Sequence, residues 1–226
     1  MSNGVFITGT DTGVGKTWFT LALMEAFKEQ GCKTNGMKPV ASGGSYFNDK
    51  LMNDDARLIM ESCSEPVNYE LINPYVFEQP VSPNFAARQT GVSVEFEQLV
   101  TSYNQLASAC DIVVVEGIGG WRVPLSDKIG TADLVRELEL PVILVVGLQL
   151  GCINHAILTA EAIKADGVNL CGWVSNQLET GYLHRCDTVD LLNKELSCPN
   201  IANLSHMVAL DSVKMGKKID PLFLLG

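Results

Sequence analysis

The chain has 226 residues, of which 46% are hydrophobic, and 16 basic against 26 acidic residues give a net charge of -10. This length suffices for one α/β domain with a substantial core, and the apolar content excludes a disordered or fibrous chain. The acidic balance argues against a nucleic-acid-binding protein, which needs clustered Lys and Arg. We therefore expect residues 1–226 to form a single globular domain.

The chain carries no feature of an exported or membrane-spanning protein. Residues 1–4 lack the basic start of a secretory signal, and the apolar stretch Leu140–Leu150 is too short to cross a bilayer. The number of cysteines is odd, at 7, and none form a C-x-x-C pair, so we expect reduced thiols in a cytoplasmic protein. The histidines are too far apart along the chain to suggest a zinc site.

The first predicted strand, residues 4–9, leads into a glycine-rich loop, Gly9–Thr17, that is followed by an apolar helix near 17–30. Strand, glycine-rich loop, Lys-Thr and helix is the layout of a phosphate-binding loop. Backbone N–H groups of such a loop and the helix N-terminus bind phosphate; Lys16 would reach the β- and γ-phosphates, and the Thr17 hydroxyl would ligate Mg²⁺. Thr10 stands where the first glycine of the common pattern belongs, so an ordinary glycine-rich turn is the alternative.

Strands and helices alternate through the rest of the chain. Further strands are expected at about 34–38, 111–116, 142–147 and 170–175, and further helices near 53–62, 95–109, 132–138, 154–166 and 184–196. Continuous apolar strands between helices predict a mostly parallel sheet covered on both faces. Gly31 and Gly167 lie where helix ends are expected. Residues 73–90 include three prolines and show little periodicity, which is typical of a ligand-binding loop.

Polar residues follow the predicted strands, where an open parallel sheet binds its ligands. Lys38 and Ser42 follow one strand and suit an anionic or phosphoryl ligand, although Lys38 alone could be an ordinary surface lysine. Glu116 ends another strand and suits Mg²⁺, directly or through water, and the glycines after it allow close approach of a substrate. Asn176 follows a third strand and has an amide that reads base edges, or it simply forms a turn.

Two helix starts add candidate ligands. Asp54 and Asp55 begin the helix near 53–62, where they either complete an Mg²⁺ shell or only favour the helix dipole. Residues 150–155 enter the helix near 154–166, where free N–H groups would bind a carboxylate or Asn154 would act as a cap.

Together these segments resemble the dethiobiotin synthetase family. The stretches that carry the resemblance are TDTGVGKT (residues 10–17), KPVASG (38–43), EGIGGW (116–121) and LGCINHA (150–156). With shorter matches at 53–56, 73–75, 82–83 and 124–127, they cover most of residues 4–176 in the order of the family. The resemblance implies a P-loop NTPase-like three-layer α/β fold.

The resemblance also implies a reaction and partners. Members of this family join 7,8-diaminopelargonic acid and CO₂ at the expense of MgATP, through a carbamate and a carbamic-phosphoric anhydride, to give dethiobiotin, ADP and phosphate. They are homodimers with sites at the interface. We therefore expect small-molecule substrates, Mg²⁺ as cofactor and a second copy of this chain, with no nucleic acid and no membrane.

The family's site residues fall on matching positions of this chain. The resemblance implies Lys16 and Lys38 as catalytic; Gly13, Val14, Gly15, Lys16, Thr17, Trp18, Glu116 and Asn176 as ATP-binding; Thr12, Lys38 and Ser42 as substrate-binding, with Gly151, Cys152, Ile153 and Asn154 from the partner subunit; and Thr17, Asp55 and Glu116 as metal-binding.

The chain departs from the family pattern in three places. Gly13 stands where some relatives carry an acidic residue, and residues 201–206 replace an Ile-Pro pair that faces the nucleotide base. The adenine pocket, and with it the preference for ATP over other nucleotides, is therefore not assigned. Some relatives bind the substrate carboxylate with a tyrosine in the helix after Asn176; Tyr182 and Thr188 lie nearby in the sequence, and neither is assigned that role.

Two other functions compete with this interpretation. One is a different ATP-dependent amide-forming enzyme of the same superfamily, although no glutaminase-like domain is present. The other is a partitioning ATPase that acts as a dimerising switch, although such proteins usually carry an extra lysine early in the loop, where this chain has Thr, Asp and Thr. Some of those proteins end in a basic membrane helix, and here Gly216 and Pro221 interrupt the corresponding segment, Lys214–Leu225.

Overall fold

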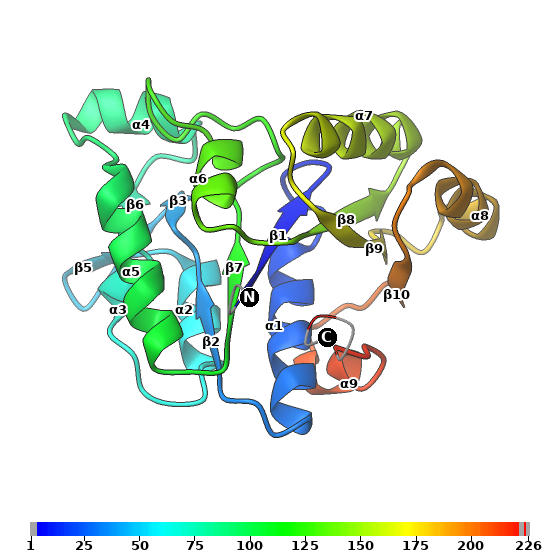
Figure 1. The fold of residues 1–226 in the computed structure, drawn as a ribbon, viewed down its shortest axis with the longest axis horizontal. Coiled ribbons are helices and arrows are strands. Elements are labelled where there is room, and N and C mark those ends of the chain that lie inside the picture. Colours follow the sequence, from blue (N-terminus) through cyan, green and yellow to red (C-terminus); the bar gives the residue numbers. More distant parts are fainter. Residues whose placement is uncertain (1–3, 222–223, 225–226) are drawn as a thin grey trace.

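A computed structural model describes residues 4–221 and 224, which fold around a six-stranded parallel sheet (Figure 1). In spatial order its strands are β10 (Asn200–Leu204), β9 (Leu170–Gln177), β8 (Val142–Leu148), β1 (Gly4–Gly9), β7 (Ile112–Glu116) and β2 (Thr34–Met37). Every residue of β1, β7 and β8 is buried. These strands are continuous apolar runs because helices cover both sides of a parallel sheet.

Helices pack on the two faces of the sheet as the sequence predicts. The helices of the described residues are α1 (Lys16–Glu29), α2 (Asp54–Glu61), α3 (Tyr69–Ile72), α4 (Pro83–Thr90), α5 (Phe96–Ser108), α6 (Thr131–Glu137), α7 (Cys152–Ala165), α8 (Arg185–Glu195) and α9 (Ser212–Gly216). Helix α1 packs on β1, β2 and β7 beside α2 and α9, while α5 packs on β2 and β7 and α7 on β8 and β9. The connection from β1 to β2 crosses the sheet in one direction, and the connections from β2 onward cross it in the other. Because such crossovers are right-handed, α1 lies on one face of the sheet and α5–α8 lie on the other.

The strand register brings the functional strand ends together. Strand β7 lies between β1 and β2, with Ile7 paired to Glu116 and Met37 paired to Val115. The chain therefore leaves β1, β2 and β7 at one edge of the sheet, where a cleft forms in parallel α/β proteins. Gly31 and Gly167 follow α1 and α7 with φ of 81° and 73°, which confirms them as helix-ending glycines.

The structure adds elements that the sequence pattern did not reveal. The loop expected at 73–90 contains β6 (Tyr75–Phe77), which pairs with β3 (Val40–Ser42), and also helix α4. Strand β3 is followed by a hairpin of the exposed strand β4 (Ser45–Phe47) and β5 (Lys50–Met52), and residues 200–204 form strand β10. These elements are short, and a few residues give too little periodicity to separate a strand or helix from a loop.

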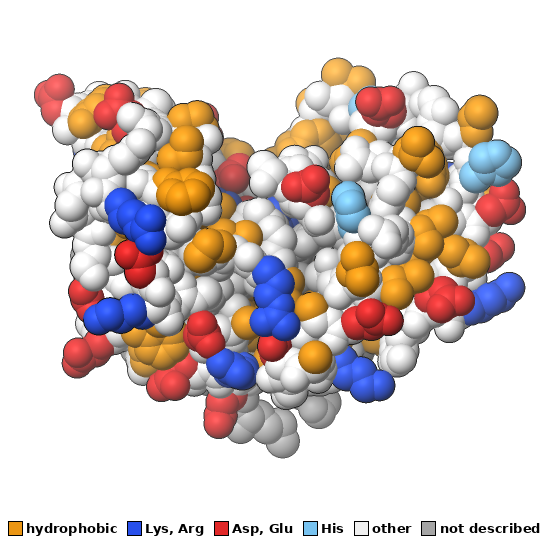
Figure 2. Space-filling model, turned by 90° about the horizontal axis from the view of Figure 1, so that it is seen from above, with side chains coloured by type: hydrophobic (Ala, Val, Ile, Leu, Met, Phe, Trp, Pro, Cys, Tyr) orange, Lys and Arg blue, Asp and Glu red, His pale blue; other side chains and the backbone are white. Residues whose placement is uncertain are grey.

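The described residues contain no helix that is long and apolar enough to cross a membrane. All seven cysteines are free thiols, as expected. Of the segment considered as a basic membrane helix, Lys214 lies in α9, while residues 222, 223 and 225 lie outside the described residues. In Figure 2 the Lys and Arg side chains are scattered over the face shown and do not gather into a patch there.

Candidate active site

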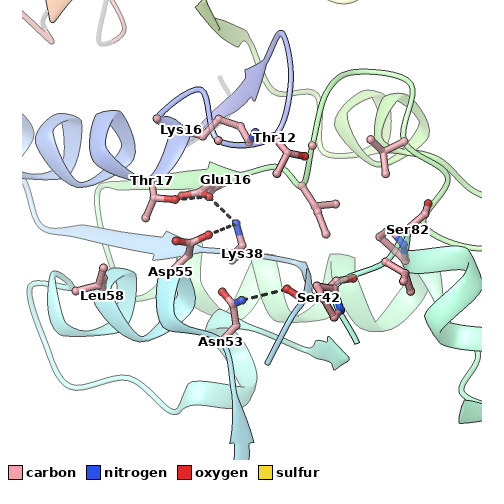
Figure 3. A pocket seen from close by; sticks show the side chains of 18 of the residues that line it. Thr12, Lys16, Thr17, Lys38, Ser42, Asn53, Asp55, Leu58, Ser82 and Glu116 are labelled. Atoms are coloured by element: carbon pink, nitrogen blue, oxygen red, sulfur yellow. Dashed lines mark hydrogen bonds and ion pairs between the residues drawn. The ribbon is translucent and has the colours of Figure 1, made fainter. Parts of the chain in front are cut away.

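A pocket of about 720 Å³ opens at the carboxyl edge of the sheet. Its lining comes from the phosphate loop, the ends of β2 and β7, the start of α2 and the loop before α4 (Figure 3). The predicted residues that line it are Thr12, Gly13, Gly15, Lys16, Thr17, Trp18, Lys38, Ser42, Asp55 and Glu116. Seen from above, the molecule has a deep notch between two raised parts (Figure 2).

The phosphate loop depends on glycines that no other residue replaces easily. Gly13 and Gly15 have φ of 75° and 92°, in the left-handed region that favours glycine. A Cβ on Gly15 would stand 2.1 Å from Nδ2 of Asn176. The same Nδ2 donates a 2.9 Å hydrogen bond to the carbonyl of Val14, so the end of β9 holds the loop in shape.

Lys16 is buried at the base of this loop, with 7% of its surface exposed. Its Nζ donates to the backbone oxygen of Asp11 at 2.8 Å. Burial lowers the pKa of Lys16 from 10.5 to about 8, because a charged amine loses its hydration there. A phosphate ligand would restore a strong partner to the ammonium group.

This pKa predicts that ATP binding weakens in alkaline solution. Above a pH of about 8 the free protein loses the Lys16 proton, and phosphate binding, which favours the charged form, must take it up again. The affinity for ATP should then fall by up to roughly tenfold per pH unit, as measured by calorimetry. Lys16→Arg, which keeps its charge, should flatten this dependence, and a flat profile in the unaltered protein would contradict the assignment.

Four charged or polar side chains meet beside the loop: one directly follows β2, and the others come from β7, α1 and α2. Glu116, which is fully buried, accepts hydrogen bonds at Oε1 from the Lys38 ammonium at 2.5 Å and from the Thr17 hydroxyl at 2.9 Å (Figure 3). Lys38 Nζ also lies 3.2 Å from Oδ2 of Asp55. Burial alone would lower the pKa of Lys38, but the carboxylates of Glu116 and Asp55 outweigh it and raise that pKa. Lys38 is therefore a buried cation, which rules out the ordinary surface lysine considered above.

A second set of hydrogen bonds fixes the backbone around Lys38, and the sequence analysis did not assign it. The Asn73 amide donates to the carbonyl of Lys38 at 2.7 Å, and Tyr69 donates to Asn73 Oδ1 at 2.8 Å. Tyr69 also accepts from the backbone of Asn53, whose side chain caps α2 at Ala56. This chain of bonds links the starts of α2 and α3 to the end of β2, so that Asp55 faces Lys38.

Ser42 lines the pocket with a hydroxyl that has no hydrogen-bond partner among the described residues. Its backbone oxygen accepts from the Asn53 amide at 3.4 Å, which anchors the strand without using the hydroxyl. A buried polar group without a partner is costly, so a ligand atom is the natural partner for this hydroxyl.

The donor set fits Mg²⁺ that is bound together with phosphates. Thr17, Asp55 and Glu116 supply oxygens, which Mg²⁺ prefers, and Glu116 Oε2 is buried without a partner among the described residues. No group of three His, Cys, Asp or Glu side chains able to hold a metal ion by itself occurs in the described chain. The geometry therefore suits the usual arrangement in which a few protein oxygens and the substrate phosphates share the ion.

The remaining predicted residues do not line this pocket. The Val14 side chain is buried in the core, and Asn176 lies behind the loop against Gly15. Gly151, at a φ of 94°, precedes α7, which begins at Cys152; Asn154 therefore lies inside the helix, and the alternative that it caps the helix is wrong. The contribution of residues 151–154 to a partner's site stays a prediction.

A tyrosine does lie beside this helix start. The Tyr182 hydroxyl is 3.8 Å from Sγ of Cys152 and 3.0 Å from the hydroxyl of Thr188 in α8. The sequence alone assigns no role to Tyr182 or Thr188, and only the packing of α8 against α7 brings them to the N-terminus of α7.

A glycine loop that precedes α1, a lysine and threonine at its end, and a carboxylate on the neighbouring strand define a P-loop protein built to bind nucleoside phosphates. Among solved structures, a ParA family ATPase from Chlorobium tepidum shares the fold, with 10% identity, 99% of each chain covered and a TM-score of 0.57. A family model described as an AAA domain matches residues 3–214.

Curated relatives identify the family within the P-loop proteins. An ATP-dependent dethiobiotin synthetase of Vibrio parahaemolyticus is 40% identical over 97% of this chain and 96% of its own length. Relatives with the same description from Xylella fastidiosa and Aromatoleum aromaticum are 44% and 39% identical over 89% and 95% of this chain, and over the same shares of their own lengths. This chain belongs to the ATP-dependent dethiobiotin synthetase family.

Proposed function

We propose that the chain joins 7,8-diaminopelargonic acid and CO₂ to form dethiobiotin, with cleavage of ATP to ADP and phosphate, as a cytoplasmic enzyme. The observation that carries this proposal is the placement of Lys38 beside Glu116 and Asp55, within one pocket that also contains the phosphate loop. A lysine between the phosphate loop and an unpartnered serine hydroxyl suits a reaction between a phosphate and an anionic carbamate.

In this proposal the protein contributes position and charge rather than covalent chemistry. The phosphate loop and Lys16 hold the β- and γ-phosphates, while Lys38 and Ser42 hold the carbamate formed from one amine and CO₂. The carbamate oxygen then attacks the γ-phosphorus and ADP leaves. The two lysines offset the negative charge on the transferred group, which is where an electrostatic contribution matters most.

Ring closure follows in the same pocket. The second amine attacks the carbonyl carbon of the mixed anhydride, and the bond from that carbon to the phosphate oxygen breaks. Apolar residues of the pocket wall, Pro80, Val81, Pro83, Ile118 and Val123, would pack against the alkyl chain of the diamine. They would also keep water from the anhydride, which otherwise hydrolyses.

Magnesium would be held by Thr17, Asp55 and Glu116 together with the phosphates, and it would supply Lewis-acid charge at the transferred phosphoryl group. Glu116→Gln, which removes one charge at nearly constant shape, should raise the Mg²⁺ concentration for half-maximal turnover by about tenfold or more. The measurement is a Mg²⁺ titration at saturating ATP. Glu25→Gln, in α1 but not among the residues that line the pocket, is the matched control, and an unchanged titration in Glu116→Gln would contradict the metal role.

The substrate carboxylate would lie at the start of α7 of a second subunit in a homodimer. The N-terminus of a helix favours an anion, and the Tyr182 hydroxyl lies beside Cys152 there. Leu150 and Leu183 are 100% and 89% exposed near this end of the helix, as expected of residues that a partner covers.

Tyr182→Phe tests this carboxylate site. Loss of one hydroxyl donor should raise the KM for the diamine by about tenfold and leave the KM for ATP unchanged. Steady-state kinetics with each substrate varied in turn measures both constants. Tyr46→Phe, on the exposed β4 strand, is the control, and equal changes in both KM values would point to a general structural effect.

The experiment that tests the function itself is ADP release with MgATP and radiolabelled bicarbonate, with and without 7,8-diaminopelargonic acid. Diamine-dependent ADP release with acid-stable label in the product supports the proposal. ADP release that is indifferent to the diamine, with no fixed label, would instead favour an ATPase switch of the ParA type.

A further inference from the structure

The carboxylates proposed to hold Mg²⁺ already bind a cation that belongs to the chain. The Lys38 ammonium lies 2.5 Å from Glu116 Oε1 and 3.2 Å from Asp55 Oδ2 (Figure 3). The oxygen of Glu116 that accepts from Lys38 is also the one that accepts from Thr17. Of the groups expected around the metal, Glu116 and Asp55 contact the Lys38 ammonium directly, and Thr17 contacts the same oxygen of Glu116.

Burial makes the pairing of Lys38 with Glu116 strong. Glu116 is 0% and Lys38 is 4% exposed, so bulk water does not hydrate either charge and each depends on its partner. A divalent ion at the same carboxylates would neutralise them more fully and would repel the nearby ammonium. The unpartnered Oε2 of Glu116 gives the metal a place to bind, and a metal there would weaken the attraction of the same carboxylate for Lys38.

We propose that Lys38 and Mg²⁺ compete for Glu116 and Asp55, so that metal entry releases the Lys38 ammonium toward the substrate. This inference rests on the proposed function for the identity of that substrate. The flexible four-carbon stem of lysine allows such a movement, and Lys38 and Ser42 line the same pocket. The exchange couples metal binding to substrate binding. Lys38 becomes available to an anionic carbamate when the metal and nucleotide are bound.

Lys16 provides an internal comparison. It carries the same charge and lies near the same carboxylates, but its ammonium bonds to the backbone oxygen of Asp11. Removing Lys16 therefore changes only the general positive potential at the metal site, whereas removing Lys38 also removes the competing contact. The difference between the two variants isolates the competition.

The test is a titration of Mn²⁺ into the nucleotide-free protein, with free Mn²⁺ measured by electron paramagnetic resonance. Mn²⁺ is a suitable probe because it prefers the same oxygen ligands as Mg²⁺. Lys38→Met should bind Mn²⁺ on the order of tenfold more tightly than the unaltered protein, and Lys16→Met less than about threefold more tightly. Equal gains in both variants, or no gain in Lys38→Met, would overturn the proposal.

A measurement on the unaltered chain does not depend on how well the variant folds. In a crystal structure with Mn²⁺ and a non-hydrolysable ATP analogue, the proposal requires the metal at Glu116 or Asp55 and Lys38 Nζ beyond hydrogen-bond distance of Glu116. A bound metal with Lys38 still on Oε1, or no metal at these carboxylates, overturns it. Neither experiment involves turnover, so their failure is distinguishable from loss of diamine-dependent ADP release.

Discussion

Lys38→Ala is expected to lower the turnover number by about 1,000-fold. Removal of a single preorganised charge at a developing anion typically has effects of this order. Lys38 is the only predicted residue that touches both carboxylates of the site, and it faces the same pocket as Ser42. The assay is diamine-dependent ADP release at saturating substrates, and near-normal turnover would refute the catalytic role of Lys38.

Loss of activity must be separated from loss of stability in this variant. Removing Lys38 leaves Glu116 buried without its counterion, which is expected to reduce the free energy of unfolding by about 3 kcal/mol. The double variant Lys38→Ala/Glu116→Gln removes both charges, and it should regain most of the stability but none of the turnover. Lys50→Ala is the control, since Lys50 is exposed and pairs with Glu70 at the surface.

Gly15→Ala is expected to abolish measurable ATP binding, a loss of at least about 100-fold in affinity. A methyl group there would stand 2.1 Å from Asn176 Nδ2, and the backbone φ of 92° disfavours any residue with a Cβ. Either the loop or Asn176 must move, and both outcomes would disturb the backbone N–H groups that are expected to bind phosphate. Equilibrium binding of a fluorescent ATP analogue measures the effect.

Gly13→Ala is the matched control for this prediction. Gly13 also has a positive φ, of 75°, but a Cβ there meets nothing within 4 Å. Its replacement should cost only the backbone strain, about 1 kcal/mol, and should leave ATP binding largely intact. If the two variants lose ATP binding equally, strain in the loop rather than contact with Asn176 is the cause.

Glu116 and Lys38 show which features of the site the sequence predicts and which it does not. Both residues end predicted strands, and the rule that ligands gather at the carboxyl ends of parallel strands placed them in one site. The rule holds here because β7 lies between β1 and β2, so the three strand ends are neighbours. That they share an ion pair, with Thr17 on the same oxygen, follows from side-chain packing that no spacing in the sequence encodes.

Asn176 shows the opposite case. Its position after an apolar strand indicated an amide at a ligand edge, with a turn as the alternative. In the structure its amide donates to Val14 and packs against Gly15, a contact across more than 160 residues of chain. Its proposed contact with the nucleotide base stays a prediction, while its contact with the phosphate loop emerged only from the assembled sheet.

The sequence by itself determined the phosphate loop, the parallel sheet and the helices that flank it. Those features arise from contiguous residues: glycines that allow positive φ, apolar runs long enough to be buried, and glycines that end helices. Tertiary structure alone decided which distant groups become partners, such as Asn73 with the Lys38 carbonyl and Tyr182 with Cys152. Such pairs depend on strand order and helix packing, because hydrogen bonds act over about 3 Å in space however far apart the residues lie in the chain.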